Sequence, residues 1–272
     1  MKKCNTCGGT TLFLGNDTYR CLYCGNEYNV RNSTPINAGK TTTLNVEQKD
    51  NGVDVFEMNV DGVLETKWSD ERCTYSGSGF LISEDGYALT NTHVVTHKDG
   101  RSCGMLNVRI KGQQVRASVV QLGDNKHGSG NGIDLALIKL DRLPHNSKPL
   151  TFENFDNVRI GERVFVIGNS LGYGTCITSG IVSDKCREVN GKMLLMTDCA
   201  VNGGNSGGPV FNDKGNVIGV IVSGITGAKG MNFAIPSKDA ISFINNKISG
   251  LRINSGTNAT RYDTKAKTSR SK

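Results

Sequence analysis

Short apolar or alternating segments, separated by turns that contain Gly or Asp, follow one another from about residue 46 onward. Segments of this length and texture predict β-strands, and many of them with little helical periodicity predict an all-β sandwich or barrel. The predicted strands are Val53–Met58, Gly79–Ser83, Tyr87–Thr90, Leu106–Lys111, Val115–Leu122, Leu135–Leu140, Arg163–Gly168, Thr175–Ser183, Met193–Thr197, Pro209–Asn212, Val217–Ser223 and Asn232–Ile235.

One late segment, Ser237–Lys247, has a different spacing. Ser237 and Asp239 stand at its beginning, where such residues are typical of a helix N-terminus. Its apolar positions recur at helical intervals and predict a terminal helix that packs one face on the body. These apolar positions are Ala240, Ile241, Phe243, Ile244 and Ile248.

Composition and charge divide the chain into four parts. Of 272 residues, 36% are hydrophobic, which is enough for a sizeable core, and no apolar run approaches the roughly 18–20 residues of a membrane span. Residues 31–45 contain turn formers without apolar periodicity. Residues 247–272 contain seven Lys or Arg and one Asp. We therefore predict a small metal-binding unit over 1–30, a linker over 31–45, a globular domain over 46–249 and a basic disordered tail over 250–272.

Four of the nine cysteines have the spacing of a metal site. Cys4 and Cys7, and then Cys21 and Cys24, form two C-x2-C pairs that are each followed by Gly. Two residues between thiolates let both reach one tetrahedral ion, and two such turns supply four ligands. The spacing resembles a zinc ribbon with one structural zinc ion. Disulfides or redox pairs are the alternatives, and no βαβ pattern or apolar leader accompanies the motif.

The other five cysteines are odd in number and scattered along the chain. They are Cys73, Cys103, Cys176, Cys186 and Cys199. Without an apolar leader, this usage favours free thiols in a reducing compartment, so we predict a cytoplasmic protein.

Three short motifs in the body carry the chemistry. GSGFLISEDGYALTNTHVV contains His93, NGIDLALIKL contains Asp134, and AVNGGNSGGPV contains Ser206. A serine hydroxyl needs a neutral imidazole to accept its proton, and that imidazole needs a carboxylate to hold its tautomer. Each residue taken alone has a structural alternative: a core histidine, a turn cap, or a small residue in a Gly-rich hairpin. Together they predict a nucleophilic triad that needs no catalytic cofactor.

The glycines around Ser206 strengthen this hypothesis. Attack on a carbonyl creates an oxyanion, which must meet preorganised N–H donors. Glycine permits the backbone angles that aim successive amides at one point. Gly204 and Ser206 are the predicted donors of this oxyanion hole.

Residues from about 50 to 247 resemble a chymotrypsin-fold serine endopeptidase of the HtrA/Deg-like bacterial branch. The strings GSGFLISEDGYALTNTHVV, IDLALIKL, TDCAVNGGNSGGPVFNDKGNVIGV and NFAIPSK carry the resemblance. It implies two six-stranded antiparallel β-barrels with His93 as general base, Asp134 as its partner, Ser206 as nucleophile, and an acyl-enzyme intermediate. Members of this branch usually have an export signal and PDZ domains, and neither is evident in this sequence.

The resemblance also indicates a specificity. The position six residues before the nucleophile helps to form the base of the primary pocket, and here it is Ala200. Val222 and Ser223 are predicted to line the same pocket. No carboxylate stands at Ala200, so cleavage is expected after small or medium apolar residues of a protein or peptide substrate.

The leading prediction is therefore a serine endopeptidase with a zinc ribbon that recruits or regulates it, through contact with a protein partner. An alternative is a catalytically silent binding or regulatory protein whose ribbon and basic tail contact a partner or nucleic acid. The positive charge is the only feature that favours nucleic acid. An esterase would use the same residues. Reaction at Ser206 separates the first two, and cleavage of proteins separates the first from the third.

Overall fold

The computed structural model describes residues 11–15, 18–21, 27–29, 51–71, 73–124, 132–224, 230–248 and 250–256. These belong to two compact units, Met1–Gln48 and Lys49–Lys272. Each unit is described by itself below. No helix in the described ranges has the length and apolar character needed to cross a membrane.

The first unit contains a small antiparallel sheet. Its strands are β1 (Thr11–Gly15), β2 (Thr18–Cys21) and β3 (Glu27–Asn29), and they pair in that order. Thr11 at the start of β1 pairs with Cys21 at the end of β2. The other three cysteines of the predicted zinc site lie outside the described residues.

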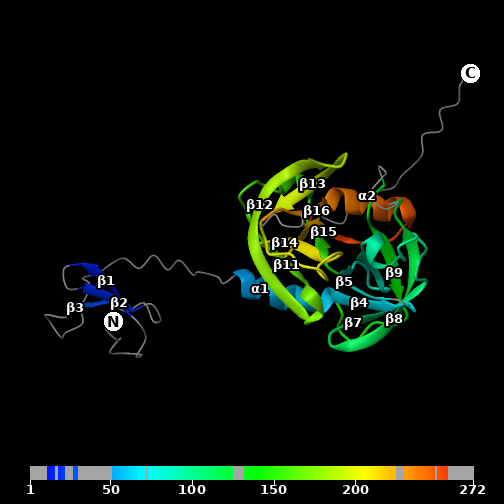
Figure 1. The fold of residues 1–272 in the computed structure, drawn as a ribbon, viewed down its shortest axis with the longest axis horizontal. Coiled ribbons are helices and arrows are strands. Elements are labelled where there is room, and N and C mark those ends of the chain that lie inside the picture. Colours follow the sequence, from blue (N-terminus) through cyan, green and yellow to red (C-terminus); the bar gives the residue numbers. More distant parts are fainter. Residues whose placement is uncertain are drawn as a thin grey trace, which may run out of the picture. The chain divides into compact units, whose positions relative to one another are not determined.

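The second unit begins with helix α1 (Asn51–Asn59) and the short helix η1 (Val60–Gly62), and then forms a closed six-stranded barrel (Figure 1). The barrel strands are β4 (Val63–Ser69), β5 (Thr74–Leu81), β6 (Tyr87–Thr90), β7 (Met105–Ile110), β8 (Gln113–Leu122) and β9 (Ala136–Leu140), closed in the order β4-β5-β6-β9-β8-β7. Exposed and buried residues alternate strictly along β7, because successive side chains of a strand point to opposite faces. The buried positions fill the barrel.

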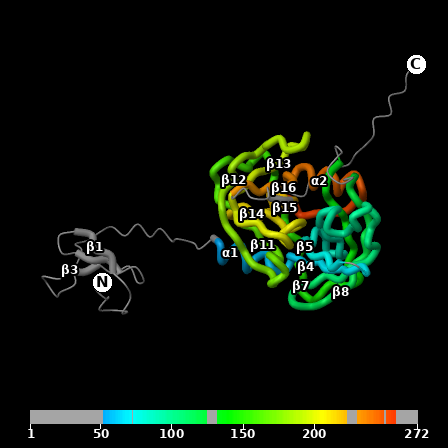
Figure 2. The backbone as a smooth tube through the Cα atoms, in the orientation of Figure 1, coloured from blue at the N-terminus to red at the C-terminus, as the bar shows by residue number. Residues whose placement is uncertain are grey.

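A second ring of six antiparallel strands follows (Figure 2). It consists of β11 (Arg163–Asn169), β12 (Thr175–Val189), β13 (Lys192–Thr197), β14 (Pro209–Asn212), β15 (Val217–Gly224) and β16 (Asn232–Pro236). Pairing of β14 with both β11 and β15 closes the ring. The short strands β10 (Thr151–Phe152) and β17 (Asn254–Ser255) extend the sheet in parallel beside β15. The two predicted barrels are confirmed.

Helix α2 (Ser237–Lys247) has the predicted bounds, and Ala240, Phe243 and Ile244 on its inner face are buried. The other predicted strands lie within a few residues of their positions, with one exception. The predicted strand Val53–Met58 is wrong, because these residues belong to helix α1.

In α1, Val55 and Asn59 are one helical turn apart, both are buried, and the Asn59 side-chain amide donates to the Val55 carbonyl (3.0 Å). Val53 and Met58 are exposed. The alternation of apolar and polar residues therefore concealed the buried face of helix α1.

The described body also continues past the predicted boundary at residue 249. Thr151 and Phe152 of β10 pair with Asn254 and Ser255 of β17. Leu251 and Ile253 pack against a buried cluster to which both barrels contribute, so these residues extend the domain rather than begin a tail.

Candidate active site

His93 and Asp134 lie at the ends of neighbouring strands of the first barrel. His93 belongs to the short helix η2 (Thr92–Val94), which begins two residues after the end of β6, and Asp134 lies two residues before β9. His93 Nδ1 is 2.6 Å from Asp134 Oδ2, and the backbone N–H of His93 donates to Oδ1 (3.1 Å). Because a carboxylate only accepts, Nδ1 carries the proton and Nε2 is the basic nitrogen.

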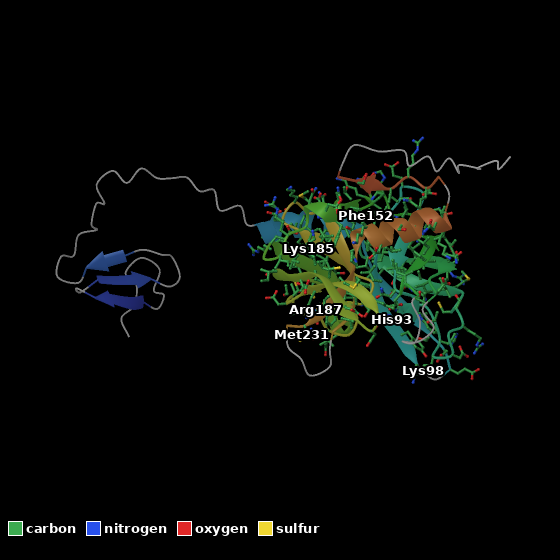
Figure 3. All side chains as sticks on the ribbon, turned by 90° about the horizontal axis from the view of Figure 1, so that it is seen from above. His93, Lys98, Phe152, Lys185, Arg187 and Met231 are labelled. Atoms are coloured by element: carbon green, nitrogen blue, oxygen red, sulfur yellow. The ribbon has the colours of Figure 1, made fainter. Side chains whose placement is uncertain are left out.

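The segments that carry these two residues are joined by side-chain bonds. The Asn91 amide donates to the backbone carbonyl of Asp134 (2.8 Å), and the Thr92 hydroxyl donates to that of Leu135 (2.7 Å). Asn91, Thr92 and the Asp134 side chain are buried, while 38% of the His93 side chain is exposed. The imidazole is thus held by Asp134 through Nδ1, while another part of the ring is exposed to solvent. Figure 3 shows His93 where the two barrels meet.

Ser206 lies on the loop between β13 and β14 of the second barrel. It lines the same cleft as His93, a hollow of about 430 Å³. Its hydroxyl donates to the backbone carbonyl of Val222 (3.2 Å). No hydrogen bond between Ser206 and His93 occurs in the described part of the chain, so proton transfer requires the hydroxyl to turn from Val222 towards Nε2.

The cleft has one aromatic wall, formed by Tyr75. The Tyr75 ring stacks on Trp68 with centroids 4.0 Å apart, and its hydroxyl donates to Asp70 (3.3 Å). Asp70 also pairs with His97 Nδ1 (3.0 Å), and the Trp68 indole N–H donates to the Val94 carbonyl (2.7 Å). These contacts fix the position of the Tyr75 ring. The full lining is Thr74, Tyr75, Ser76, His93, Val94, Leu171, Gly203, Gly204 and Ser206.

The predicted specificity residues are not part of this lining. Ala200 is exposed, and its carbonyl accepts from the Thr178 hydroxyl (2.9 Å). Val222 touches the site through its carbonyl, which accepts from Ser206. The side chain of Ser223 lies outside the described residues.

Three cleft-lining amides of the nucleophile loop are free to bind an anion. The N–H groups of Asn205, Gly207 and Gly208 donate to backbone carbonyls. Those of Gly203, Gly204 and Ser206 have no acceptor among the described residues, and all three residues line the cleft. Gly204 has φ +97°, and a Cβ there would lie 2.1 Å from the Asn169 carbonyl oxygen. Glycine is therefore required at this position.

Sequence reasoning missed the residues that support this loop. Ser78 of β5 and Asn169 of β11 are buried and bonded around it. Of these two residues, only Ser78 stands in a motif that the sequence analysis quoted, the string that begins GSGF. No group of three or more His, Cys, Asp or Glu side chains suited to a metal occurs in the described ranges.

The model of the trypsin-like peptidase domain family matches residues 77–220, a range that includes His93, Asp134 and Ser206. This chain belongs to that family. A protein named probable periplasmic serine endoprotease DegP-like, from Chlamydia trachomatis, is 39% identical to this chain over 196 residues. The match covers 68% of this chain and 36% of that protein, so the chain spans about a third of its length.

Solved structures agree with the trypsin-like fold. The serine endoprotease from Yersinia pestis has a TM-score of 0.61 at 27% identity, covering 72% of this chain and 66% of that one. The HtrA-type protease AlgW with a tripeptide has a TM-score of 0.63 at 29% identity, covering 72% and 63%. The trypsin-like domain therefore has the two-barrel architecture of HtrA-type proteases.

Proposed function

We propose that this chain is a serine endopeptidase of the HtrA/Deg-like branch, acting through His93, Asp134 and Ser206. The observation that carries the proposal is that the buried carboxylate of Asp134 binds both the ring nitrogen Nδ1 and the backbone N–H of His93. That histidine shares its cleft with Ser206 and with unbonded backbone amides, those of Gly204 and Ser206 among them. Family membership and the names of the similar proteins support the same activity.

The chemistry follows from these positions. His93 Nε2 takes the proton of Ser206 Oγ, and the oxygen attacks the carbonyl carbon of the substrate. The N–H groups of Gly204 and Ser206 bind the oxyanion that forms. Collapse of this adduct breaks the C–N bond, and the imidazolium gives its proton to the departing amine. Water, deprotonated by His93, then hydrolyses the acyl-enzyme and restores the serine.

The proposed substrates are proteins or peptides with a small or medium apolar residue before the scissile bond. Ala200 supplies no charge, and the exposed carboxylate of Asp198 nearby accepts the N–H of Ile181 (2.7 Å). A peptide-library cleavage profile tests this preference. A profile dominated by Lys or Arg would refute it, and turnover of small esters without any protein cleavage would favour an esterase.

The activity itself is tested with a fluorophosphonate probe and peptide mapping. We expect covalent labelling at Ser206 that is absent in Ser206→Ala, because phosphonylation requires an activated nucleophile and an oxyanion hole. The Ser83→Ala variant is the matched control, since Ser83 is a buried serine that binds the N–H of Tyr87 and is not part of the cleft lining.

A catalytically silent protein is the second candidate, and one observation favours it. The Ser206 hydroxyl donates to Val222 and is not bonded to His93 among the described contacts. Folded protein that shows no labelling at Ser206 would establish this alternative. The search would then turn to what the first unit and the basic residues near the C-terminus bind.

We also propose that Cys4, Cys7, Cys21 and Cys24 hold one structural zinc ion. The register supports this, since Thr11, four residues after Cys7, pairs with Cys21, three residues before Cys24. Both motifs therefore adjoin, along the sequence, the end of the β1–β2 hairpin at which Thr11 and Cys21 pair. A tetrahedral thiolate site would fix that end and stabilise a unit too small for its own core.

Elemental analysis tests the zinc proposal. We expect one zinc ion per chain, lost in the double variant Cys7→Ser/Cys24→Ser and kept in Cys73→Ser/Cys186→Ser, whose cysteines are exposed in the second unit. Equal zinc content in both variants would refute it. The proposed cytoplasmic location rests on the odd number and scattered positions of the other five cysteines, and fractionation of cells tests it.

A further inference from the structure

Ser78 makes four hydrogen bonds, two of which join the first barrel to the nucleophile loop. It is fully buried in β5. Its N–H donates to the carbonyl of Ser206 (2.8 Å), and its hydroxyl lies 2.7 Å from the carbonyl oxygen of Gly204. The N–H of Asn169 reaches the same hydroxyl (2.9 Å), and the Thr90 hydroxyl donates to the Ser78 carbonyl (2.7 Å).

The direction of the hydroxyl bond is fixed. The N–H of Asn169 can only donate, so it occupies a lone pair of Ser78 Oγ. The single hydroxyl proton must therefore point at the carbonyl of Gly204. Ser78 thus fixes the peptide between Gly204 and Asn205, which lies between the two peptides that carry the oxyanion donors.

The two donor peptides are held by their carbonyls in the same way. In a trans peptide the C=O and the N–H point in opposite directions, so a bond to one aims the other. The N–H of Leu171 donates to the Gly203 carbonyl (2.7 Å), which aims the Gly204 N–H. The N–H of Gly208 donates to the Asn205 carbonyl (2.9 Å), which aims the Ser206 N–H.

The atoms around Ser78 are packed too closely for a side chain at either of two neighbouring glycines. A Cβ at Gly207 would lie 2.3 Å from the Ser78 carbonyl oxygen, and one at Gly168 would lie 2.8 Å from Ser78 Oγ. Leu171 adopts φ +55°, a conformation that a leucine rarely adopts, and 62% of it is exposed. A leucine held in this way indicates that its neighbours determine the backbone there.

We propose that Ser78 is a positioning residue of the oxyanion hole, which together with the N–H of Leu171 clamps the peptides around Gly204. Ser78 acts through the backbone of the nucleophile loop and does not touch the substrate. The proposal rests on the proposed endopeptidase function. It predicts that loss of the hydroxyl weakens stabilisation of the tetrahedral adduct more than binding of the peptide.

The test compares Ser78→Ala with Ser83→Ala, a buried serine of the same hairpin whose hydroxyl accepts the N–H of Tyr87 (3.0 Å). Since removal of one oxyanion donor lowers kcat by roughly 10² to 10³, we expect Ser78→Ala to lower it about 10- to 100-fold with KM within about threefold. Affinity for a peptide boronic acid, which forms a tetrahedral adduct, should fall in parallel. Affinity for the product peptide, which forms no tetrahedral adduct, should not change.

Ser83→Ala should lower the melting temperature and leave kcat unchanged. Wild-type kcat and boronate affinity in folded Ser78→Ala would overturn the proposal, and so would an equal loss of kcat in both variants. If Ser78→Ala does not fold, Ser78→Cys replaces it, because a thiol keeps the volume but is a weak donor. Wild-type protein without any Ser206 labelling would instead overturn the proposed function.

The other half of the clamp has its own pair of variants. Leu171→Pro removes the N–H that binds Gly203 and excludes positive φ, whereas Leu171→Gly keeps the N–H and permits the angle. We expect a loss of kcat in the proline variant like that of Ser78→Ala. The kcat of the glycine variant should exceed that of the proline variant by at least about 10-fold. Equal kcat in the two variants would overturn the role of Leu171.

Discussion

Replacing Glu153 with Gln should destabilise the second barrel in a pH-dependent way. Glu153 is only 6% exposed, and four donors surround its carboxylate. Oε1 accepts the N–H of Asn154 (3.1 Å) and the amide of Asn157 (2.9 Å), and Oε2 accepts the amides of Asn212 and Asn216 (3.0 Å each). Glutamine keeps the shape but offers only one acceptor oxygen.

The structure determines on which side the new amide must sit. Asn212 cannot turn its amide, since its oxygen accepts the N–H groups of Lys214 (3.1 Å) and Asn216 (3.0 Å). The NH2 of the glutamine must therefore face Asn157, which can turn, and Asn154, whose N–H loses its acceptor. One lost bond and three weakened ones correspond to about 2–4 kcal/mol of unfolding free energy, because bonds to charged groups contribute roughly 1.5–3 kcal/mol each.

The pH dependence follows from the pKa of Glu153. Burial raises this pKa, but the amides of Asn157, Asn216 and Asn212 and the N–H of Asn154 together lower it, and the net shift is downward. A carboxyl whose pKa is lower in the folded state stabilises the protein above its unfolded pKa of about 4.3, and this contribution is lost as the pH falls through the folded pKa. The difference between wild type and Glu153→Gln should be constant near neutrality and shrink below about pH 4.

Urea unfolding measures this difference at several pH values. Far-UV circular dichroism follows the strands, and fluorescence of the single tryptophan, Trp68, follows the first barrel. Coincident curves would show that both barrels unfold together. Glu84→Gln, at an exposed glutamate, is the control. A change below about 0.5 kcal/mol in Glu153→Gln, or a difference that does not vary with pH, would refute the reasoning.

Three further changes have defined outcomes. Asp134→Asn should lower kcat by about 10⁴, because an amide cannot accept both N–H groups of His93, and wild-type kcat would contradict the assigned role. Gly207→Ala should lower the melting temperature by more than a surface Gly→Ala change does, since Gly207 has φ +83° and no room for a Cβ, and calorimetry decides this. Burial raises the pKa of the Cys199 thiol to about 11, so iodoacetamide at pH 8 should label the exposed Cys73 and Cys186 and spare Cys199 in folded protein, as mass spectrometry would reveal.

Strand periodicity predicted most of the two barrels because their strands are short and bounded by turns. It failed where the first barrel begins. Val53–Met58 alternates like a strand but forms α1, and β4 was missed, although Leu64, Thr66 and Trp68 are buried on alternate positions. Glu65 and Lys67 dilute the apolar pattern there. A half-polar barrel strand is recognised only when its partners, β5 and β7, are known.

Motifs located His93, Asp134 and Ser206 because each stands in a short characteristic string, and the structure places His93 beside Asp134 and in one cleft with Ser206. They could not locate the support of the nucleophile loop. The bond from Ser78 to Gly204 spans 126 positions, and its importance depends on which peptide the carbonyl belongs to. The predicted pocket residue Ala200 likewise depends on loop geometry that strand and motif patterns do not specify.

The two barrels contribute different parts of the site. The first barrel carries both His93 and Asp134, so the two bonds between them are made within that barrel. The second barrel carries Ser206, yet β5 of the first barrel helps to orient its loop. Glu65 of β4 adds a second bridge, since its carboxylate accepts the N–H (3.1 Å) and the hydroxyl (3.0 Å) of Thr175. A shift between the barrels would therefore break the contacts of Ser78 and Glu65 with the second barrel, whereas the His93–Asp134 bonds are made within one barrel.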